Sequence, residues 1–228
     1  MQARVLSSRL PGKVLLPLHG KPLLLYLIES LRQTSYDAEI VVVTSKQRSD
    51  DPLTELCGKA RVDVFRGSMD NVASRFRDVV KSRRSDCFVR ICGDSPLLDH
   101  ELVDTALDLY FRHDVDIVTN TLPRTFPKGM SVAVVRARTF VDAVPCFREP
   151  RHVEHVLSYF YENQAGFRIL NFTADSDFSA VNLAVDTNED AKRVSAVIGR
   201  MTRPHWTYRM REIVQLCRCI GGEDREGE

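Results

Sequence analysis

A short loop near the amino end carries many groups that can bind phosphate. Residues 3–13 read ARVLSSRLPGK, with three cations, two hydroxyl groups and a Pro-Gly turn. Such a loop can direct backbone N–H groups, serine hydroxyls and arginine forks at a polyphosphate, whose charge requires several fixed donors. It has neither the P-loop pattern nor the glycine pattern of a Rossmann site, so neither of those binding mechanisms applies. A solvated basic loop is the alternative interpretation.

Two aspartates, each at the end of an apolar run, are candidate magnesium ligands. Asp94 follows the run Cys87–Cys92, and Asp186 follows Val181–Val185. A carboxylate just past the carboxyl end of a buried strand points into the crevice where α/β sheets bind ligands. Mg²⁺ takes one or two carboxylates together with phosphate oxygens, whereas helix capping is the alternative role. With the basic loop, the aspartates predict a Mg²⁺–nucleotide site, provided that the fold brings the three segments together.

Strand-like and helix-like runs alternate along the chain, which predicts an α/β fold with a mostly parallel sheet flanked by helices. Short β-branched runs indicate strands buried on both faces. In the second half, two strand-like runs around a helix indicate a small mixed extension. We expect strands at 39–44, Val62–Phe65, Cys87–Cys92, Val115–Thr119, Met130–Val135, Phe167–Phe172 and Val181–Val185, a helix around Val153–Tyr161 and a last core helix at Asn188–Met201.

Composition limits the classes of function. The 228 residues include 32 Lys plus Arg and 31 Asp plus Glu, so a net charge of +1 provides no global field for nucleic acid or an anionic membrane. No apolar run approaches the roughly 20 residues of a membrane span. Cys217 and Cys219 have no second pair at zinc-site spacing, so no metal is expected there. We expect a cytoplasmic protein with one domain at 1–203 and an accessory helix and tail at 204–228.

Ordered motifs from Gln2 to about Met201 resemble the cytidylyltransferases of the spore coat polysaccharide biosynthesis type. These enzymes are relatives of the synthetases that make CMP-octulosonate and CMP-sialic acid. The family pattern A-R-x-x-S-x-R-L-P-x-K is found at residues 3–13. Further agreement comes from DDPL at 50–53, FRGS at 65–68, VASR at 72–75, VR at 89–90, GDSPL at 93–97, EHV at 154–156 and VDT at 185–187.

The resemblance implies a nucleotide-diphospho-sugar transferase fold and a Mg²⁺-dependent transfer of CMP from CTP to a sugar, with release of pyrophosphate. A homodimer formed through the Met130–Phe172 extension is expected by analogy. The catalytic residues implied are Arg9, Lys13 and Asp94, and the metal ligands Asp94 and Asp186. The nucleotide-binding residues implied are Ala3, Arg4, Ser7, Ser8, Arg9, Lys13, Thr44, Ser45, Arg75 and Gly93. The sugar-binding candidates are Asn120, Lys128, Ser131 and His155.

The sequence departs from the family pattern in three places. The family begins with a short apolar strand before Gln-Ala-Arg, of which this chain carries only Met1. We therefore expect exposed strand edges and a less stable site, and interpret the start as misplaced or the chain as a fragment. Leu6 stands where the family usually has Gly. Ser131 and Ala133 stand where the family tends to have two carboxylates, so the sugar differs or activity is reduced, because neither side chain acts as a base near neutral pH.

Two other functions remain open. Asp114 and Asp116 form an Asp-x-Asp motif that is typical of metal-dependent glycosyltransferases, although the basic loop has no role in such an enzyme. The departures at Ser131 and Ala133, together with the missing first strand, favour a catalytically silent protein that binds nucleotide or acts as a scaffold.

Overall fold

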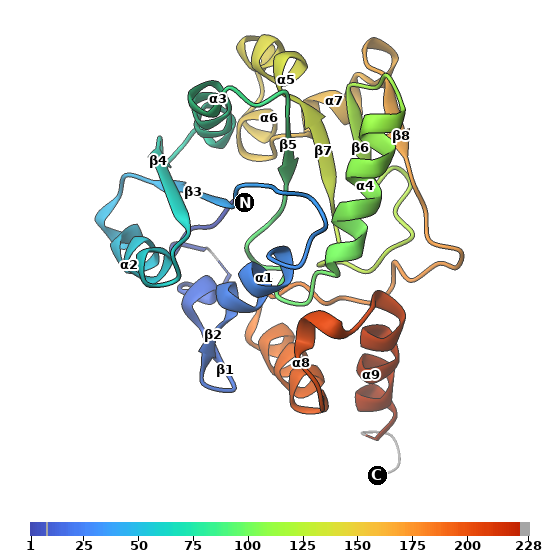
Figure 1. The fold of residues 1–228 in the computed structure, drawn as a ribbon. Coiled ribbons are helices and arrows are strands. Elements are labelled where there is room, and N and C mark those ends of the chain that lie inside the picture. The colour runs from blue at the N-terminus through green and yellow to red at the C-terminus, as the bar shows by residue number, and fades with distance from the viewer. Residues whose placement is uncertain (8, 224–228) are drawn as a thin grey trace.

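The computed structural model describes residues 1–7 and 9–223 (Figure 1). Its strands are β1 (Pro17–Leu18), β2 (Lys21–Pro22), β3 (Val41–Ser45), β4 (Asp63–Gly67), β5 (Cys87–Arg90), β6 (Ile117–Thr119), β7 (Ala133–Arg136) and β8 (Ile169–Asn171). Its α-helices are α1 (Leu23–Leu31), α2 (Asp51–Lys59), α3 (Val72–Arg83), α4 (His100–Arg112), α5 (Ala137–Ala143), α6 (Pro150–Glu154), α7 (Ser158–Glu162), α8 (Asn188–Gly199) and α9 (Met210–Glu223).

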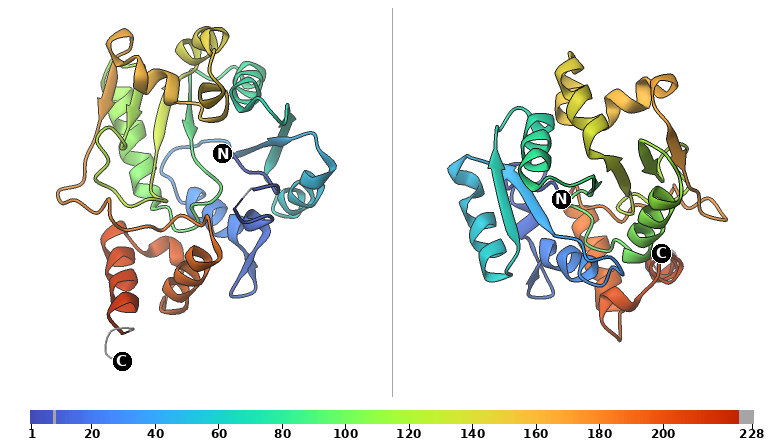
Figure 2. Two further views of the ribbon diagram at one scale, coloured as in Figure 1. Left: turned by 180° about the vertical axis from the view of Figure 1, so that it is seen from behind. Right: turned by 45° about the horizontal axis from the view of Figure 1, so that its top comes forward.

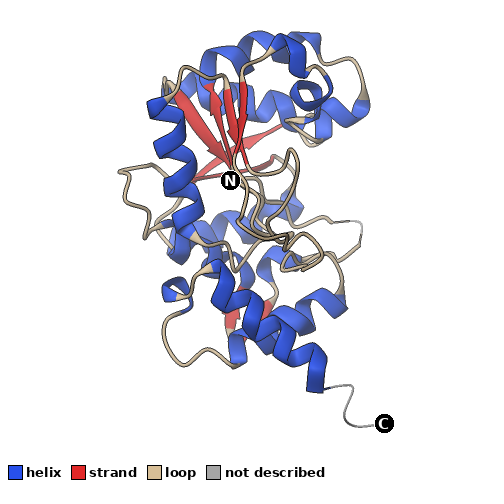
Figure 3. Ribbon diagram, turned by 90° about the vertical axis from the view of Figure 1, so that its right-hand side faces the viewer, coloured by secondary structure: helices blue, strands red, loops and turns tan. Residues whose placement is uncertain are grey.

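The main sheet is built in two parts. Strands β3 and β4 pair in parallel, with Val43 opposite Phe65. The second part has the order β5-β7-β6-β8, in which β7 is antiparallel to both of its neighbours and β6 is parallel to β8. Figure 3 shows these strands between helices, and the two-stranded β1–β2 hairpin apart from them. The expected α/β class with a mixed extension is thus confirmed.

Neighbouring residues of one strand face two different hydrophobic cores, because side chains alternate across a sheet. In β7, Val134 belongs to a core that also takes in α1, α4, α8 and α9. Ala133 and Val135 belong to a second core, built with α3, α5 and α7. The rotated views in Figure 2 show the helices on either side of the strands. The buried residues of β7 are therefore apolar on both faces of the sheet, as its run of apolar residues indicates.

Residues 1–3 connect the two parts of the sheet. Gln2 forms parallel bridges with Val43 on one side and Cys92 on the other, and the amino group of Met1 donates to the carbonyl of Val41 at 2.8 Å. Beyond this link, an apolar cavity of about 460 Å³ separates β3 from β5, with Phe76 and Phe88 in its lining. Residues of both β3 and β5 line this cavity.

Two segments differ from the sequence-based expectations. Residues 181–185 do not form a strand of a sheet, because this segment pairs with loops. Asn182 makes an isolated bridge with Lys128. The expected helix around Val153–Tyr161 is divided into α6 and α7, with the chain leaving helical geometry at His155.

The carboxyl-terminal helix α9 packs on α8 and buries Ile213 and Val214. No helix among the described residues is long and apolar enough to cross a membrane.

Candidate active site

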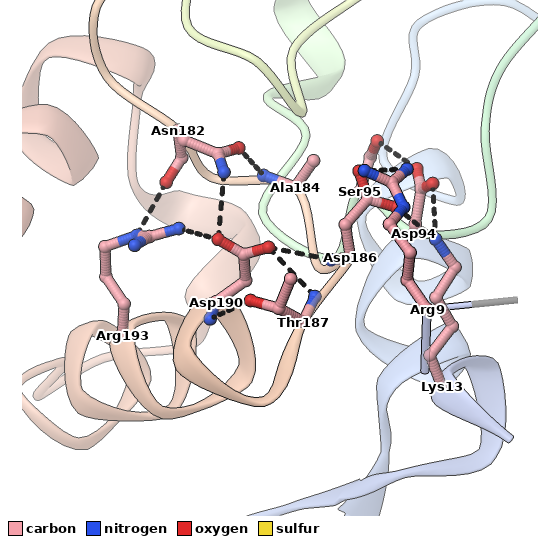
Figure 4. A network of polar contacts seen from close by, with 10 residues as sticks. All are labelled: Arg9, Lys13, Asp94, Ser95, Asn182, Ala184, Asp186, Thr187, Asp190 and Arg193. Carbon is pink, nitrogen blue, oxygen red and sulfur yellow. Dashed lines mark hydrogen bonds and ion pairs between the residues drawn. The ribbon is translucent and has the colours of Figure 1, made fainter. Parts of the chain in front are cut away.

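Lys13 lies between the two aspartates that the sequence singles out. Its Nζ atom donates to Asp94 Oδ2 at 2.9 Å and to Asp186 Oδ1 at 2.8 Å (Figure 4). Only 11% of the Lys13 side chain is exposed. Burial opposes its charge, but the carboxylates of Asp94 and Asp186 outweigh burial and raise the pKa of Lys13. The structure thus brings segments from both ends of the chain around one ammonium group.

Arg9 reaches the same place from the solvent side. Its Nη2 atom lies 2.9 Å from Asp186 Oδ2, and 65% of its side chain is exposed. An exposed pair of this kind contributes little to stability, so Arg9 can exchange its partner for an anionic ligand at low cost. Ser7 is half-buried in the same loop, while Ser8 lies outside the described residues.

Backbone contacts fix the position of Asp94. The N–H of Gly93 donates to the carbonyl of Gln2 at 2.7 Å, and the carbonyl of Asp94 accepts the N–H of Val185 at 2.9 Å. A Cβ atom on Gly93 would lie 2.9 Å from both the carbonyl oxygen of Gln2 and the Cβ of Ala3. Glycine is needed because the basic loop passes so closely. The segments carrying the two aspartates are therefore joined to each other and to the loop.

The amino end of α8 fixes Asp186. Thr187 and Asp190 form a capping box, in which each side chain accepts the backbone N–H of the other. Asp190 also accepts the backbone N–H of Asp186 at 3.0 Å and a hydrogen bond from Asn182 at 2.9 Å (Figure 4). Capping is thus performed by Thr187 and Asp190, which leaves the carboxylate of Asp186 to face Lys13 and Arg9.

Asp50 is a positioning residue that sequence reasoning missed. This buried carboxylate accepts the N–H of Val5 at 2.7 Å and the N–H of Ser45 at 3.0 Å, and the Ser45 hydroxyl also donates to it. Burial opposes ionisation, but the hydrogen bonds from Ser45 and Val5 outweigh it and lower the pKa of Asp50. Asp50 therefore holds the basic loop against the end of β3. The available signal is its place in the DDPL motif, one residue before a helix-starting Asp-Pro pair.

The remaining nucleotide-binding candidates lie in this loop or at the end of β3. Ala3 is buried and donates its N–H to the carbonyl of Val43 at 3.3 Å. Arg4 forms an ion pair with Glu154 at 2.8 Å. Thr44 is fully buried at the end of β3, and the hydroxyl of its neighbour Ser45 is used by Asp50.

Arg75 is a buried cation with free hydrogen-bonding capacity. It is 0% exposed, and its Nη1 donates to the carbonyl of Ser68 at 2.8 Å. Its Nε and Nη2 atoms are buried with no hydrogen-bond partner among the described residues. Burial and the nearby charge of Arg4 lower the pKa of Arg75. An anionic ligand at the loop would compensate this charge.

A second cavity of about 220 Å³ lies beside β6 and β7. Of the sugar-binding candidates, Ser131 and His155 line it. Asn120 is buried, and its amide group is used by the backbone, donating to Met130 and accepting from Val132. Lys128 is exposed and is not part of the lining. The structure thus brings two of the four candidates to one cavity.

The aspartates of the Asp-x-Asp motif have partners of their own. Asp114 pairs with Arg136 and Arg168. Asp116 accepts hydrogen bonds from Thr139 at 2.9 Å and from the backbone N–H of Arg168 at 3.0 Å. These contacts join the ends of β6, β7 and β8, which gives both carboxylates a structural role.

The donor set at Lys13 suits a hard divalent cation. Asp94 and Asp186 present oxygens to one common point, and both carboxylates are partly exposed, at 23% and 29%. Mg²⁺ is commonly held by one or two carboxylates, with phosphate oxygens and water completing its coordination. No group of three or more His, Cys, Asp or Glu side chains that could hold a metal is found in the described part of the chain. A metal held here therefore needs oxygens from a ligand.

Comparison with known proteins shows that the chain is similar to cytidylyltransferases. The family model described as "Cytidylyltransferase" matches residues 1–190. The spore coat polysaccharide biosynthesis protein SpsF of Bacillus subtilis is 33% identical over 204 residues, covering 86% of this chain and 84% of SpsF. The 3-deoxy-manno-octulosonate cytidylyltransferase of Escherichia coli is 29% identical over 173 residues, covering 70% of this chain and 69% of the enzyme.

Solved structures of cytidylyltransferases are also similar to this chain. A cytidylyltransferase from Leptospira borgpetersenii superposes with a TM-score of 0.90 at 30% identity, over 98% of this chain and 93% of its own. CMP:2-keto-3-deoxy-manno-octonic acid synthetase, solved with CTP, superposes with a TM-score of 0.67 at 20% identity, over 87% of this chain and 96% of its own, which bears on the fold alone. The family resemblance seen in the sequence is confirmed: the chain belongs to the cytidylyltransferase family.

Proposed function

We propose that this protein transfers CMP from CTP to a sugar acid, with release of pyrophosphate, in a Mg²⁺-dependent step of cell-surface polysaccharide biosynthesis. The observation that carries the proposal is the convergence of Lys13 and Arg9 on Asp94 and Asp186. A site that combines two cations with paired carboxylates suits a metal-bound triphosphate. A cytoplasmic location, where CTP is available, and a homodimer formed through residues 130–172 belong to the same proposal.

The proposed chemistry is an in-line attack by a sugar hydroxyl on the α-phosphorus of CTP. Asp94 and Asp186 would hold Mg²⁺, which when bound supplies charge neutralisation at the phosphate oxygens. Lys13 and Arg9 would neutralise the charge that develops on the leaving pyrophosphate. Asp50, through Val5, fixes the loop that carries both cations. Positioning and charge neutralisation then provide most of the rate enhancement.

Pyrophosphate release tests this function directly. The protein is incubated with CTP, Mg²⁺ and a panel of sugar acids that includes 3-deoxy-manno-octulosonate and N-acetylneuraminate. We expect pyrophosphate and a CMP-sugar in equal amounts. Asp94→Ala and Asp186→Ala should reduce turnover at least a hundredfold, whereas Asp142→Ala, at an exposed carboxylate paired with Arg138, should leave it unchanged.

Two results would contradict the proposal. Retained turnover in Asp94→Ala would remove that residue from the metal-binding role. CTP binding without any turnover would favour the catalytically silent alternative, which the neutral residues Ser131 and Ala133 support.

Arg9→Ala and Lys13→Ala should weaken binding of CTP more than binding of cytidine, because they remove contacts with phosphate.

A further inference from the structure

Each cation of the basic loop is paired with a carboxylate from a distant segment of the chain. Lys13 and Arg9 both contact Asp186, and Arg4 Nη2 lies 2.8 Å from Glu154 Oε1. Asp186 is a proposed metal ligand, so a cation that arrives with the nucleotide would compensate its charge. Glu154 is not among the proposed metal ligands. Its negative charge therefore has no such compensation when an anionic ligand reaches the loop.

Glu154 is the last residue of α6 and is held in place by the packing of that helix. The helix lies against α3 (Figure 1), and His152 and Val156, on either side of Glu154 in the sequence, are buried. The side chains of Arg4 and Glu154 are themselves exposed at 31% and 34%. Such a partly exposed ion pair contributes little to stability, so its partners can separate at low cost.

A second guanidinium group, that of Arg75, lies within the influence of the same carboxylate. Arg75 is fully buried in α3, and a Cβ atom on Gly67 would lie 2.6 Å from its Cγ atom, so the neighbouring glycine is needed for this placement. Burial and the charge of Arg4 lower the pKa of Arg75, whereas the charges of Glu154 and Asp50 act in the opposite direction. Glu154 thus offsets the repulsion between two cations in the free protein.

We propose that Glu154 takes the place of a phosphate group at Arg4 in the free protein, and that the nucleotide displaces it on binding. This inference rests on the proposed function, because the ligand is the same CTP. Carboxylate and phosphate oxygens both accept charge-assisted hydrogen bonds from a guanidinium, so they compete for the same donors. Once displaced, the carboxylate repels the phosphates. Glu154 therefore limits the affinity of the site for CTP and for the pyrophosphate that leaves.

Isothermal titration calorimetry of Glu154→Gln tests the inference without turnover. The probes are CTP and pyrophosphate, each with Mg²⁺ and without a sugar, and cytidine alone. We expect CTP and pyrophosphate to bind the variant about three- to tenfold more tightly than the parent, because a competing and repelling charge is removed. Cytidine should bind both proteins equally. The gain should shrink when salt is raised to about 0.5 M, because salt screens partly exposed charges.

Glu149→Gln is the matched control, because it removes one negative charge at the start of the same helix. Glu149 precedes the first residue of α6, and its exposed carboxylate pairs with Arg151 instead of Arg4. The affinity of this variant for CTP and for pyrophosphate should stay within about twofold of the parent, because the charge lost is screened by solvent. Melting temperatures within a few degrees of the parent verify that both variants fold.

The outcomes separate this inference from the proposed function. Equal or weaker binding of CTP and pyrophosphate by a folded Glu154→Gln variant would overturn the competition, because Glu154 would then only hold Arg4 in place. An equal gain in Glu149→Gln would overturn it too, since the effect would be one of net charge. Tighter binding by Glu154→Gln in a protein that releases no pyrophosphate with any sugar acid would support the competition but contradict the proposed function. CTP that binds neither protein would contradict both.

Discussion

Lys13 Nζ lies 2.8 Å from Asp186 Oδ1, although 173 residues separate the two in the chain. The same nitrogen contacts Asp94, so one cation is shared by two carboxylates that come from different loops. Like charges brought together in a partly buried place repel each other strongly. In the free protein, Lys13 therefore acts as an internal counter-ion, and a divalent cation bound by both aspartates would take over that task.

Lys13→Met should make the protein depend on divalent cations for stability. The variant keeps the length of the side chain but leaves Asp94 facing Asp186 with only the exposed Arg9 as a cation, paired with Asp186. We expect a loss of about 1–3 kcal/mol in the free energy of unfolding, or roughly 2–12 °C in Tm for a chain of this size. Added Mg²⁺ should then raise the Tm of the variant more than that of the parent, as differential scanning fluorimetry would detect.

Lys59→Met is the matched control for the previous experiment. Lys59 forms an exposed i,i+4 pair with Glu55, and such pairs contribute only about 0.3–0.5 kcal/mol. Its Tm should stay close to that of the parent and respond to Mg²⁺ as the parent does. If Lys13→Met responds no more strongly to Mg²⁺ than Lys59→Met, the two carboxylates do not form a cation site.

Asp50→Asn should weaken CTP binding without removing any group that contacts CTP. The amide keeps one acceptor, but its NH₂ group would face a backbone N–H of Val5 or Ser45, both of which now donate to Asp50. We expect the KM for CTP to rise about tenfold or more and stability to fall by about 1–3 kcal/mol. Asp51→Asn, at an exposed carboxylate paired with Arg66, should change both quantities little. Steady-state kinetics on the two variants would decide, and equal KM values would exclude a positioning role for Asp50.

Local sequence patterns predict the strands and helices around the site, because each of these elements has a recognisable residue pattern of its own. The β-branched run at 41–43 and the aspartate after 87–92 can be interpreted without knowledge of the fold. The residues 181–185 show the limit of such patterns. Their apolar spacing is typical of a strand, yet the backbone N–H of Val185 donates to Asp94 and that of Leu183 donates to Lys128, so the hydrogen bonds join loops.

Long-range partners are the part that sequence patterns cannot supply. Asp50 belongs to the DDPL motif, but its partners at Val5 and Ser45 become visible only when the loop folds back on β3. Asn120 is predicted to bind sugar, but its amide is used by the backbone of Met130 and Val132. In each case, the residue type is informative and the partner is decided by tertiary packing.

His205→Gln should reduce the loss of stability in mild acid. His205 is buried, and its Nε2 donates to the carbonyl of Tyr26 at 2.8 Å. Burial lowers the pKa of His205 below 6.5; the nearby charge of Lys21 acts in the same direction, and Glu29 and the Tyr26 carbonyl act against it. Below about pH 6.5 the unfolded chain then binds more protons than the folded chain, so stability falls as pH falls.

Urea unfolding at several pH values between 5 and 8 measures this effect. Gln can still donate to Tyr26 but does not titrate, so the slope of unfolding free energy against pH should be smaller in His205→Gln than in the parent. His113→Gln, at an exposed histidine, should leave the slope as in the parent. An unchanged slope in His205→Gln would show that other groups cause the acid sensitivity.

Gly93→Ala and Gly58→Ala should change stability in opposite directions. A Cβ on Gly93 would meet the backbone oxygen of Gln2 at 2.9 Å, and backbone cannot move aside without displacing the basic loop. We expect a loss of about 1–3 kcal/mol, together with a higher KM for CTP, because the same loop carries Arg9 and Lys13. Gly58 lies in α2 with no atom within 4 Å of the added Cβ, so alanine there should stabilise by about 0.5–1 kcal/mol and leave KM unchanged. Urea unfolding with CTP kinetics on both variants checks this, and a stable, fully active Gly93→Ala would mean that Asp94 does not depend on close contact with the loop.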